Sequence, residues 1–194
     1  MKKIVILLLV LFAAFKLYQY YNGKFSKPEP PRIQTQSPET QTSMRITSSA
    51  FENNQAILGL YSCDGQNVNP PLSFLDVPSS AVSLVLIMED PDVPQNIRPD
   101  RLFVHWVVFN VQTTAAGFNQ DQAPPGILGN NSAGKAAYTG PCPPKGEHRY
   151  FFKLYALDIM LNLSQGATKE QVVAAMQGHI LAQAELLGRF ERNR

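Results

Sequence analysis

The sequence contains little charge. Asp, Glu, Lys and Arg make up only 16% of the 194 residues, whereas proline occurs 15 times. This composition favours a loop-rich β protein over a helical bundle. Three of the 17 basic residues and none of the 15 acidic residues lie in residues 1–23, so the remainder has 14 basic and 15 acidic residues and a net charge of −1. Such a near-neutral body gives no electrostatic basis for binding nucleic acid.

Patterns typical of enzymes and metal proteins are also scarce. The sequence contains no HExxH or similar compact spacing of metal ligands, and no Ser or Cys lies in a nucleophile-elbow motif. A chain of this length can bury a core without a metal or a disulfide, and we expect no cofactor. The two cysteines are Cys63 and Cys142. In an exported protein they would form a disulfide, and two buried free thiols are the alternative.

The N-terminus has the pattern of an export segment. Lys2 and Lys3 precede an uninterrupted apolar run over 4–15. Because small residues are poorly placed for signal peptidase, residues 1–23 predict an uncleaved inner-membrane anchor, with the following domain in the periplasm. A cleaved signal peptide, which would leave a secreted or periplasmic protein, is the alternative. Residues 24–44 are rich in Pro, Gln, Ser and Thr, and we interpret them as a disordered linker.

The folded domain is expected over residues 45–194. Apolar runs predict three buried strands, at 82–88, 102–111 and 149–158. Residues 112–139 contain scattered Gly, Pro and Asn, and we interpret them as a long connection. The predicted fold is therefore mainly β.

One helix is predicted near the C-terminus. Thr168 and Gln171 have capping-box spacing. Apolar residues from Val172 to Leu187 fall near one helical face, and Gly188 is in the position of the residue that ends the helix.

Polar residues lie at or near the ends of the predicted strands. Asp90 and Asp92 follow the first strand, and His105 lies inside the second. His148 and Tyr150 begin the third after a stiff loop rich in Pro and Gly, and their spacing of two places them on one face. If the three strands are neighbours, one pocket gathers all five side chains.

Three chemistries suit this group of side chains. Imidazoles, a phenol and loop amides can bind phosphate, although an ionised Asp repels it unless a proton or a ligand ammonium group intervenes. Two histidines and a carboxylate could instead hold a metal ion, or could act as general acid and base. Structural roles are the alternatives: His105 as a hydrogen-bonded core histidine, and His179 as a residue packed within the predicted helix.

Three segments carry a family resemblance. They are Asp90-Pro-Asp-Val-Pro94, Val104-His-Trp-Val-Val-Phe-Asn110 and Gly140-Pro-Cys-Pro-Pro-Lys-Gly-Glu-His-Arg-Tyr150. With shorter matches they extend over about residues 45–192. Together they resemble the phosphatidylethanolamine-binding protein family, in particular its bacterial Raf-kinase-inhibitor-like branch.

The resemblance implies a two-sheet antiparallel β fold with a small anion pocket and a cis peptide near it. By the same resemblance, the pocket binds phosphate, phosphorylated head groups similar to phosphoethanolamine, or small carboxylates. The residues implied at the pocket are Asp90, Asp92, His105, His148 and Tyr150, with Pro141 and Cys142 in the adjacent loop. The polar insert 95–102 departs from the family pattern and is expected to reshape the rim.

The favoured hypothesis is a non-catalytic, extracytoplasmic binding protein for a small anionic ligand, attached to the membrane through its N-terminal segment. One alternative is a protein-interaction module, such as an inhibitor of an envelope protease or a module for another envelope partner. A phosphoester hydrolase that uses His and Asp is the less favoured third hypothesis.

Overall fold

The computed structural model describes residues 12–21, 23 and 43–192. The predicted start of the anchor and almost all of the predicted linker lie outside these residues. Residues 12–21 form a helix with exposed side chains, in a compact unit separate from the rest of the chain. None of the helices that the structure describes is both long and apolar enough to cross a membrane.

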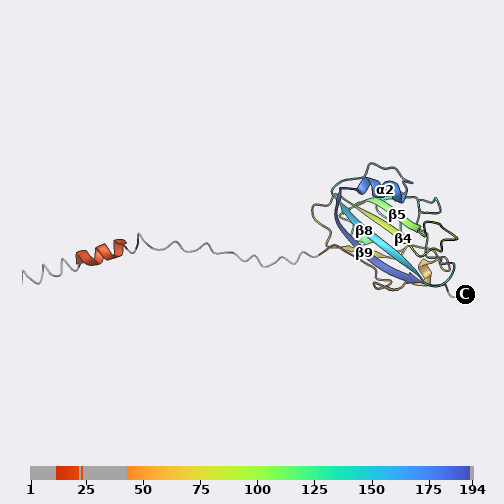
Figure 1. Ribbon diagram of the computed structural model, residues 1–194, viewed down its shortest axis with the longest axis horizontal. Helices are drawn as coiled ribbons and strands as arrows, with labels where there is room; N and C mark the ends of the chain where they lie inside the picture. Colours follow the sequence, from red (N-terminus) through yellow and green to blue (C-terminus); the bar gives the residue numbers. More distant parts are fainter. Residues whose placement is uncertain (1–11, 22, 24–42, 193–194) are drawn as a thin grey trace, which may run out of the picture. The chain divides into compact units, whose positions relative to one another are not determined.

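The second compact unit, Thr42–Arg194, is mainly β, as the sequence predicted. Its elements in chain order (Figure 1) are β1 (Arg45–Thr47), β2 (Gln55–Ala56), the 3-10 helix η1 (Gly59–Tyr61), β3 (Leu72–Leu75), β4 (Ser83–Asp90), β5 (Phe103–Gln112), β6 (Gly117–Phe118), β7 (Ile127–Gly129), β8 (His148–Leu157), α2 (Lys169–Met176) and β9 (Ile180–Phe190). They build a three-stranded sheet with the order β1-β3-β6 and a six-stranded sheet with the order β2-β9-β8-β4-β5-β7. The predicted two-sheet fold is confirmed, and β2 pairs with β9 in parallel within the otherwise antiparallel arrangement.

The larger sheet is covered on both faces. All eight residues of β4 are buried, which explains its continuous apolar sequence. Leu84 and Leu86 belong to a core shared with the smaller sheet, whereas Val85 and Ile87 belong to a second core that includes residues of α2. Strand alternation therefore divides β4 between two hydrophobic layers.

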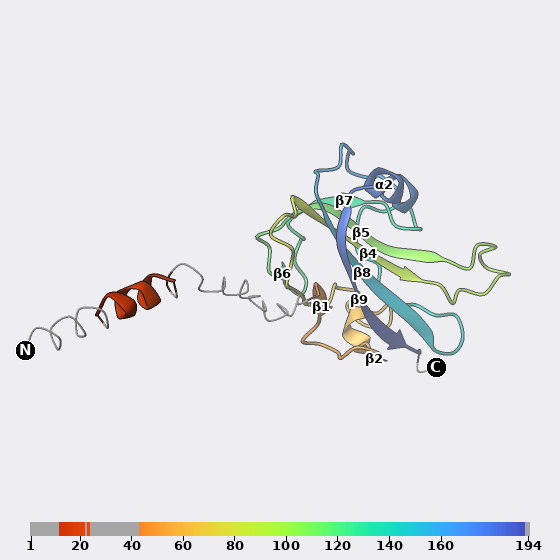
Figure 2. The same ribbon diagram turned by 60° about the vertical axis from the view of Figure 1, so that its left-hand side comes forward.

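The three predicted strands are neighbours in this sheet. β4 pairs with β5 on one side and with β8 on the other, and Figures 1 and 2 show these strands side by side. The end of β4 at Asp90 pairs with Phe103, the first residue of β5. This register brings the polar residues of all three strands to one end of the sheet.

The predicted helix is real but shorter than expected. Its capping box is present, because the Thr168 side chain accepts from the Gln171 N–H and the Gln171 side chain accepts from the Thr168 N–H. The helix ends at Met176, and Gly178 then adopts a positive φ of 81°. His179, predicted inside the helix, lies in the following turn and hydrogen-bonds Asp158 at 2.8 Å.

The sequence prediction was wrong for Ile180–Phe190, which forms β9 instead of continuing the helix. Every second residue from Ala182 to Leu186 packs against the first core, as expected for a strand. The apolar residues of this segment therefore fit a strand period of two as well as a helical spacing. Pairing with β8 along its whole length decides between the two. Gly188 lies in this strand, where a Cβ would come within 2.5 Å of the Ile57 side chain.

Short strands were also missed. The predicted connection over 112–139 contains β6 and β7, and the segment before β4 contains β3. Each has only two to four residues, which is too few for alternation to be visible in the sequence. β6 forms where Phe118 packs on Phe74 of β3, with ring centroids 5.0 Å apart.

Candidate functional site

A pocket of about 380 Å³ lies where β4, β5 and the Pro-rich loop before β8 meet. Its lining residues are Asp90, Val93, Ile97, Arg98, Phe103, His105, Thr139, Gly140, Cys142 and Pro144. Of the residues expected at the site, Asp90, His105 and Cys142 line this pocket. The remaining predicted histidine and tyrosine contact these lining residues from β8.

A bulge in β5 orients His105. The strand pairing places Glu89 opposite Val104 and Met88 opposite Trp106, so His105 has no partner on β4. A bulge of this kind turns a side chain away from the regular alternation. His105 is thereby placed in the polar end of the first core, although its neighbours continue an apolar strand.

Hydrogen bonding and burial fix the protonation of His105. Its Nδ1 lies 2.7 Å from the carbonyl oxygen of Thr139, and Nδ1 must donate there because a carbonyl only accepts. Burial lowers the pKa of His105 to about 4, so the ring is neutral at pH 7. Nε2 is then an acceptor, and it is buried with no hydrogen-bond partner in the described structure.

Tyr150 presents a second buried polar atom. Its ring packs edge-on against His105, with centroids 5.2 Å apart. Burial, with a smaller contribution from the Asp90 carboxylate, raises the pKa of the phenol, so Oη keeps its proton. Oη is buried. The Asp90 carboxylate interacts with it, but in a geometry outside that of a normal hydrogen bond. Unpartnered buried polar atoms are rare in folded proteins and are often explained by a ligand or an ordered water.

Asp90 and His148 form a buried pair. His148 Nδ1 lies 2.8 Å from one carboxylate oxygen of Asp90, and the backbone N–H of Asp92 donates to the other oxygen at 2.8 Å. Both side chains are only 4% exposed. The carboxylate is therefore held rigidly at the pocket wall, with a donor on each oxygen.

Asp92, which was expected to shape the pocket, lies beside the pocket and outside its lining. Its carboxylate accepts hydrogen bonds from the backbone N–H of Arg149 at 2.9 Å and from the guanidinium at 2.7 and 2.8 Å. These bonds lower the pKa of Asp92. Asp92 does not line the pocket, and it instead ties the segment after β4 to the start of β8.

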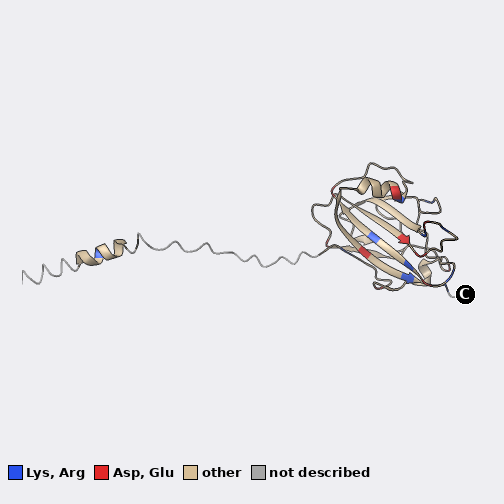
Figure 3. Cartoon of the chain, in the orientation of Figure 1, with Lys and Arg blue, Asp and Glu red and all other residues tan. Residues whose placement is uncertain are grey.

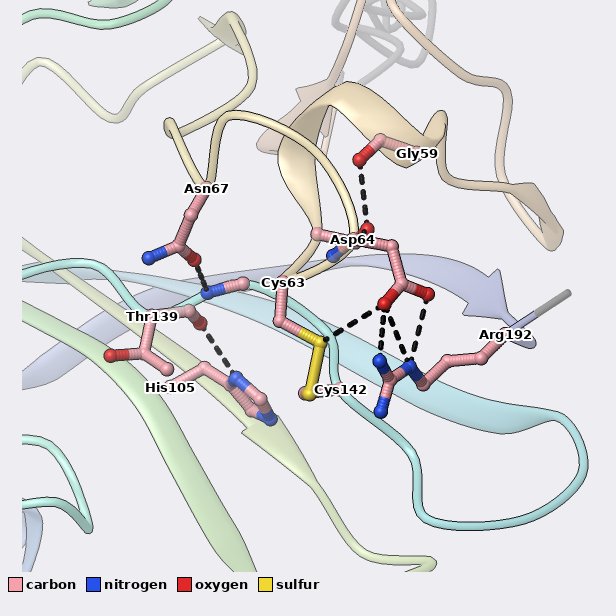
Figure 4. The surroundings of a disulfide bond; sticks show 10 residues. Gly59, Cys63, Asp64, Asn67, His105, Thr139, Cys142 and Arg192 are labelled. Atoms are coloured by element: carbon pink, nitrogen blue, oxygen red, sulfur yellow. Dashed lines mark hydrogen bonds and ion pairs between the residues drawn. A yellow bond between two sulfur atoms is a disulfide. The ribbon is translucent and has the colours of Figure 1, made fainter. Parts of the chain in front are cut away.

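The Pro-rich loop is tied firmly to the loop that follows η1. The predicted disulfide between Cys63 and Cys142 is present, and Figure 4 shows it between the two loops, close to His105. Beside it, the N–H of Cys63 donates to the Pro141 carbonyl at 3.0 Å. Pro141 therefore helps to hold the loop and does not line the pocket.

Gly140 explains why glycine is needed in this loop. A Cβ at this position would lie 2.2 Å from the carbonyl oxygen of Tyr61. The Gly140 N–H donates to Oδ1 of Asn67 at 2.7 Å, so this amide is already used and is not available to an anion. The expectation that loop amides bind phosphate therefore fails at Gly140.

The expected cis peptide is absent from the described residues. The Pro-rich loop reaches its position with trans peptide bonds only. Its shape is instead set by the disulfide, by the close approach at Gly140 and by the hydrogen bond to Pro141.

The opposite side of the pocket comes from the insert over 95–102. Arg98 donates from Nε and Nη2 to Asp100 at 3.1 and 3.0 Å, and its guanidinium lies 5.9 Å from the ring centroid of Phe103. Sequence reasoning placed this insert at the rim but did not identify its individual residues. Val93 and Pro144 lie within the signature segments but were not singled out. Ile97, Arg98 and Phe103 lie between those segments, and only this position pointed to them.

A second buried charged group is formed by Glu89, the residue that precedes Asp90 in β4. Glu89 accepts from both Lys153 and Lys169. Burial alone would raise the pKa of Glu89, but the two ammonium groups outweigh it and lower the pKa. The sequence analysis did not identify this group, whose members come from β4, β8 and α2.

Charges in the folded unit are otherwise dispersed. Figure 3 shows acidic and basic residues interspersed along the strands. Among the described residues, no group of three or more His, Cys, Asp or Glu side chains is arranged to hold a metal ion. The geometry of this site therefore gives no support to the metal hypothesis.

Comparison with known families decides the relationship. Residues 47–191 match the model of the phosphatidylethanolamine-binding protein family. The chain belongs to this family. Membership supports a binding function, and the resemblance inferred from the sequence motifs is confirmed.

Relatives and solved structures agree with this assignment. The chain is 48% identical over 150 residues to a UPF0098 protein of Chlamydia muridarum, covering 77% of this chain and 100% of that protein. It is 47% identical to the crystal structure of a putative homologue from the same family, CT736 of Chlamydia trachomatis, with a TM-score of 0.76 over 78% of this chain and 99% of that one. Escherichia coli YbcL, a solved family member, is 26% identical, with a TM-score of 0.70 and the same coverage.

Proposed function

We propose that this family member is a non-catalytic binding protein whose pocket holds a small oxyanion: phosphate, a phosphorylated head group or a small carboxylate. The observation that carries the proposal is the buried, unpartnered His105 Nε2 beside the pocket, together with the protonated Tyr150 Oη, whose interaction with Asp90 falls short of a normal hydrogen bond. One is an acceptor and the other carries a proton that it can donate. An oxyanion that retains one proton complements both.

The position of Asp90 is compatible with an anionic ligand that keeps a proton or carries an ammonium group. A fully ionised phosphate next to the Asp90 carboxylate would be repelled. The N–H groups of His148 and of the Asp92 backbone offset part of the negative potential of this carboxylate. A ligand hydroxyl that donates to His105 Nε2 or to Asp90 removes the remaining conflict. Phosphate monoesters keep such a proton below a pH of about 6.

We propose an extracytoplasmic location for this pocket. Two observations support it: the basic start followed by an apolar run at the N-terminus, and the disulfide at the pocket wall. Disulfides persist mainly in oxidising compartments. The same apolar run would attach the protein to the membrane through its N-terminal segment.

Ligand-dependent stabilisation of the full chain tests the proposal. Inorganic phosphate, phosphoethanolamine and acetate are added separately, and the midpoint of thermal unfolding is followed. A ligand at 100 times its dissociation constant stabilises the folded state by about 2.7 kcal/mol, which is several degrees for a domain of this size. The shift should be lost in His105→Ala and in His148→Ala.

His179→Ala is the matched control. His179 also pairs with an aspartate at 2.8 Å, but this pair is exposed and lies outside the pocket. This variant should keep the full ligand response. If no anion shifts the midpoint of the wild-type protein, the pocket proposal is wrong and the protein-interaction hypothesis takes its place. Turnover of a phosphoester that is abolished in His148→Ala would instead support the hydrolase.

A further inference from the structure

Exposed apolar side chains gather at the end of the large sheet that lies away from the pocket. Among residues 43–192, the large hydrophobic side chains that are exposed are Leu58, Leu75, Val82, Ile97, Met160, Ile180 and Leu181. Four of these seven lie where three segments meet, and they are 42–52% exposed: Val82, Met160, Ile180 and Leu181. Single exposed apolar residues are ordinary, whereas a group of them marks a binding surface. We call this group the apolar end.

Strand pairing brings the four residues together around Leu157, the last residue of β8. The Val82 N–H donates to the Leu157 carbonyl at 2.7 Å, and Ile180, the first residue of β9, lies directly opposite Leu157. Leu181 has no partner on β8, because the register shifts at this point. This bulge leaves two large apolar residues in succession at the surface. Met160 follows Leu157 three residues later.

The chain enters the folded unit near the apolar end. β1 begins at Arg45, which lies opposite Leu75, the last residue of β3. The turn over 76–81 then leads directly to Val82, and Asp76 in this turn accepts hydrogen bonds from the Arg45 guanidinium at 3.0 and 3.1 Å. The N-terminal segment, for which we propose membrane attachment, therefore joins the unit on this side.

The pocket lies at the opposite end of the sheet. β4 starts next to Val82 and ends at Asp90 in the pocket wall, after eight residues. At a rise of about 3.3 Å per residue, the two ends of this strand are about 25 Å apart. A surface that is contacted through the apolar end would therefore leave the pocket accessible.

Charges around the apolar end are balanced. Arg45 pairs with Asp76, and His179 Nδ1 lies 2.8 Å from Asp158. Neither pair has a surplus of positive charge, so attraction to anionic groups does not drive binding here. Removal of apolar area from water is the driving force that these residues can supply.

We infer that the apolar end docks on the surface of a lipid bilayer, as a second membrane contact besides the N-terminal segment. Its four side chains enter the boundary between head groups and acyl chains, where they lose contact with water. The N-terminal attachment keeps the domain close to the membrane, so a weak contact is sufficient. The inference rests on the proposed membrane attachment and is independent of what the pocket binds.

Vesicle binding by residues 42–194 tests the inference without the N-terminal segment. The chlamydial relatives consist almost entirely of this unit and one of them has a crystal structure, so the unit folds on its own. It should co-sediment with phosphatidylcholine vesicles at high lipid concentration. Because the contact is apolar, added phosphatidylglycerol should change the partitioning by less than about twofold.

Serine variants of this unit locate the contact. Ile180→Ser combined with Leu181→Ser removes two half-exposed apolar side chains, so partitioning into phosphatidylcholine vesicles should fall by about tenfold or more. Met160→Ser lies outside the strands and cannot disturb their pairing, and it should lower the partitioning by about threefold. Leu58→Ser is the matched control, since Leu58 is 53% exposed but lies beside Arg189, at the other end of β9. It should partition as the wild type does.

Each contrary result has a distinct meaning. If the full chain binds vesicles and residues 42–194 do not, the N-terminal attachment stands and the inference is wrong. Equal partitioning of the Ile180→Ser/Leu181→Ser variant and of Leu58→Ser would also overturn it. A dimer in sedimentation equilibrium that the double variant converts to a monomer would show that a second copy of the chain covers the apolar end instead. The response to phosphate is measured without vesicles, so the pocket proposal stands or fails separately.

Discussion

The two loops that border the pocket are held in different ways. The Pro-rich loop carries a disulfide, a glycine in close contact with the Tyr61 carbonyl and backbone hydrogen bonds to the loop after η1. The insert over 95–102 is held by turns of its own backbone and by the surface pair of Arg98 and Asp100. One wall is therefore cross-linked to a second segment of the chain, whereas the other depends on local contacts.

This difference suggests that the two loops have different roles in ligand binding. The Thr139 carbonyl fixes the tautomer of His105, so the firmly held loop controls the group that recognises the ligand head. The insert supplies Ile97 and Arg98, which line the opposite side of the pocket. Substitutions in the first loop should affect both stability and affinity, whereas substitutions in the insert should affect ligand binding and leave stability unchanged.

Removal of the disulfide, which holds the Pro-rich loop, should have the largest effect on stability and affinity. Cys63→Ala with Cys142→Ala opens a cross-link between residues 79 positions apart. Disulfides that close long loops contribute about 2–4 kcal/mol. The free energy of unfolding measured by urea denaturation should fall by that amount, and phosphate affinity should fall with it. Unchanged affinity in the folded double variant would show that the disulfide does not hold the recognition wall.

A single methyl group at Gly140 should have the next largest effect. Gly140→Ala places a Cβ 2.2 Å from a backbone oxygen that cannot move without shifting η1. Overpacking typically costs about 1–3 kcal/mol, and this close backbone contact favours the upper end. Gly59→Ala is the control, because a Cβ there meets nothing within 4 Å. Equal unfolding free energies for the two variants would contradict the close contact between Gly140 and the Tyr61 carbonyl.

The same contrast explains what could be predicted from the sequence. The buried strands and the positions of Asp90, His105 and His148 followed from long apolar runs and from motifs that span many residues. The pocket requires β4, β5 and β8 to be neighbours in one sheet. From the sequence this could only be assumed, and the structure shows it. The order of strands in a sheet cannot be read from the sequences of the individual strands.

Other features depended on contacts between distant segments. The strand β9 carried a helix-like spacing of apolar residues, and its pairing with β8 overrode that local pattern. The bulge at His105 results from a one-residue register difference between β4 and β5. The apolar rim combines Val93, Phe103 and Pro144 from three segments. None of these is encoded by local periodicity.

His105 should make stability depend on pH in a defined window. Its pKa is lowered by burial to about 4, against about 6.5 in an unfolded chain. Between these values the unfolded chain binds the proton and the folded protein does not. The stability that depends on neutral His105 is therefore fully present above pH 6.5. The free energy of unfolding declines as the pH falls toward 4.

Urea denaturation at pH 6.5 and pH 5 measures this effect. The slope of about 1.4 kcal/mol per pH unit predicts a loss of about 2 kcal/mol over the interval. His105→Phe removes the titrating group, so its unfolding free energy should be flatter over the same interval. The pKa of Asp92 is lowered, so its contribution to the free energy of unfolding is constant above about pH 4. Asp92 therefore does not alter the comparison between pH 6.5 and pH 5. Equal losses in variant and wild type would contradict the buried neutral imidazole.

The smallest effect is expected at the surface pair of the insert. Asp100→Asn removes the partner of Arg98, and exposed pairs of this kind contribute little to stability. The unfolding midpoint should not change, but phosphate affinity should rise about twofold at low salt, because one negative charge near the pocket is lost. Asp76→Asn is the control, since Asp76 forms a similar pair with Arg45 outside the pocket. If both variants changed affinity equally, the effect would reflect net charge, and the insert would have no specific part in recognition.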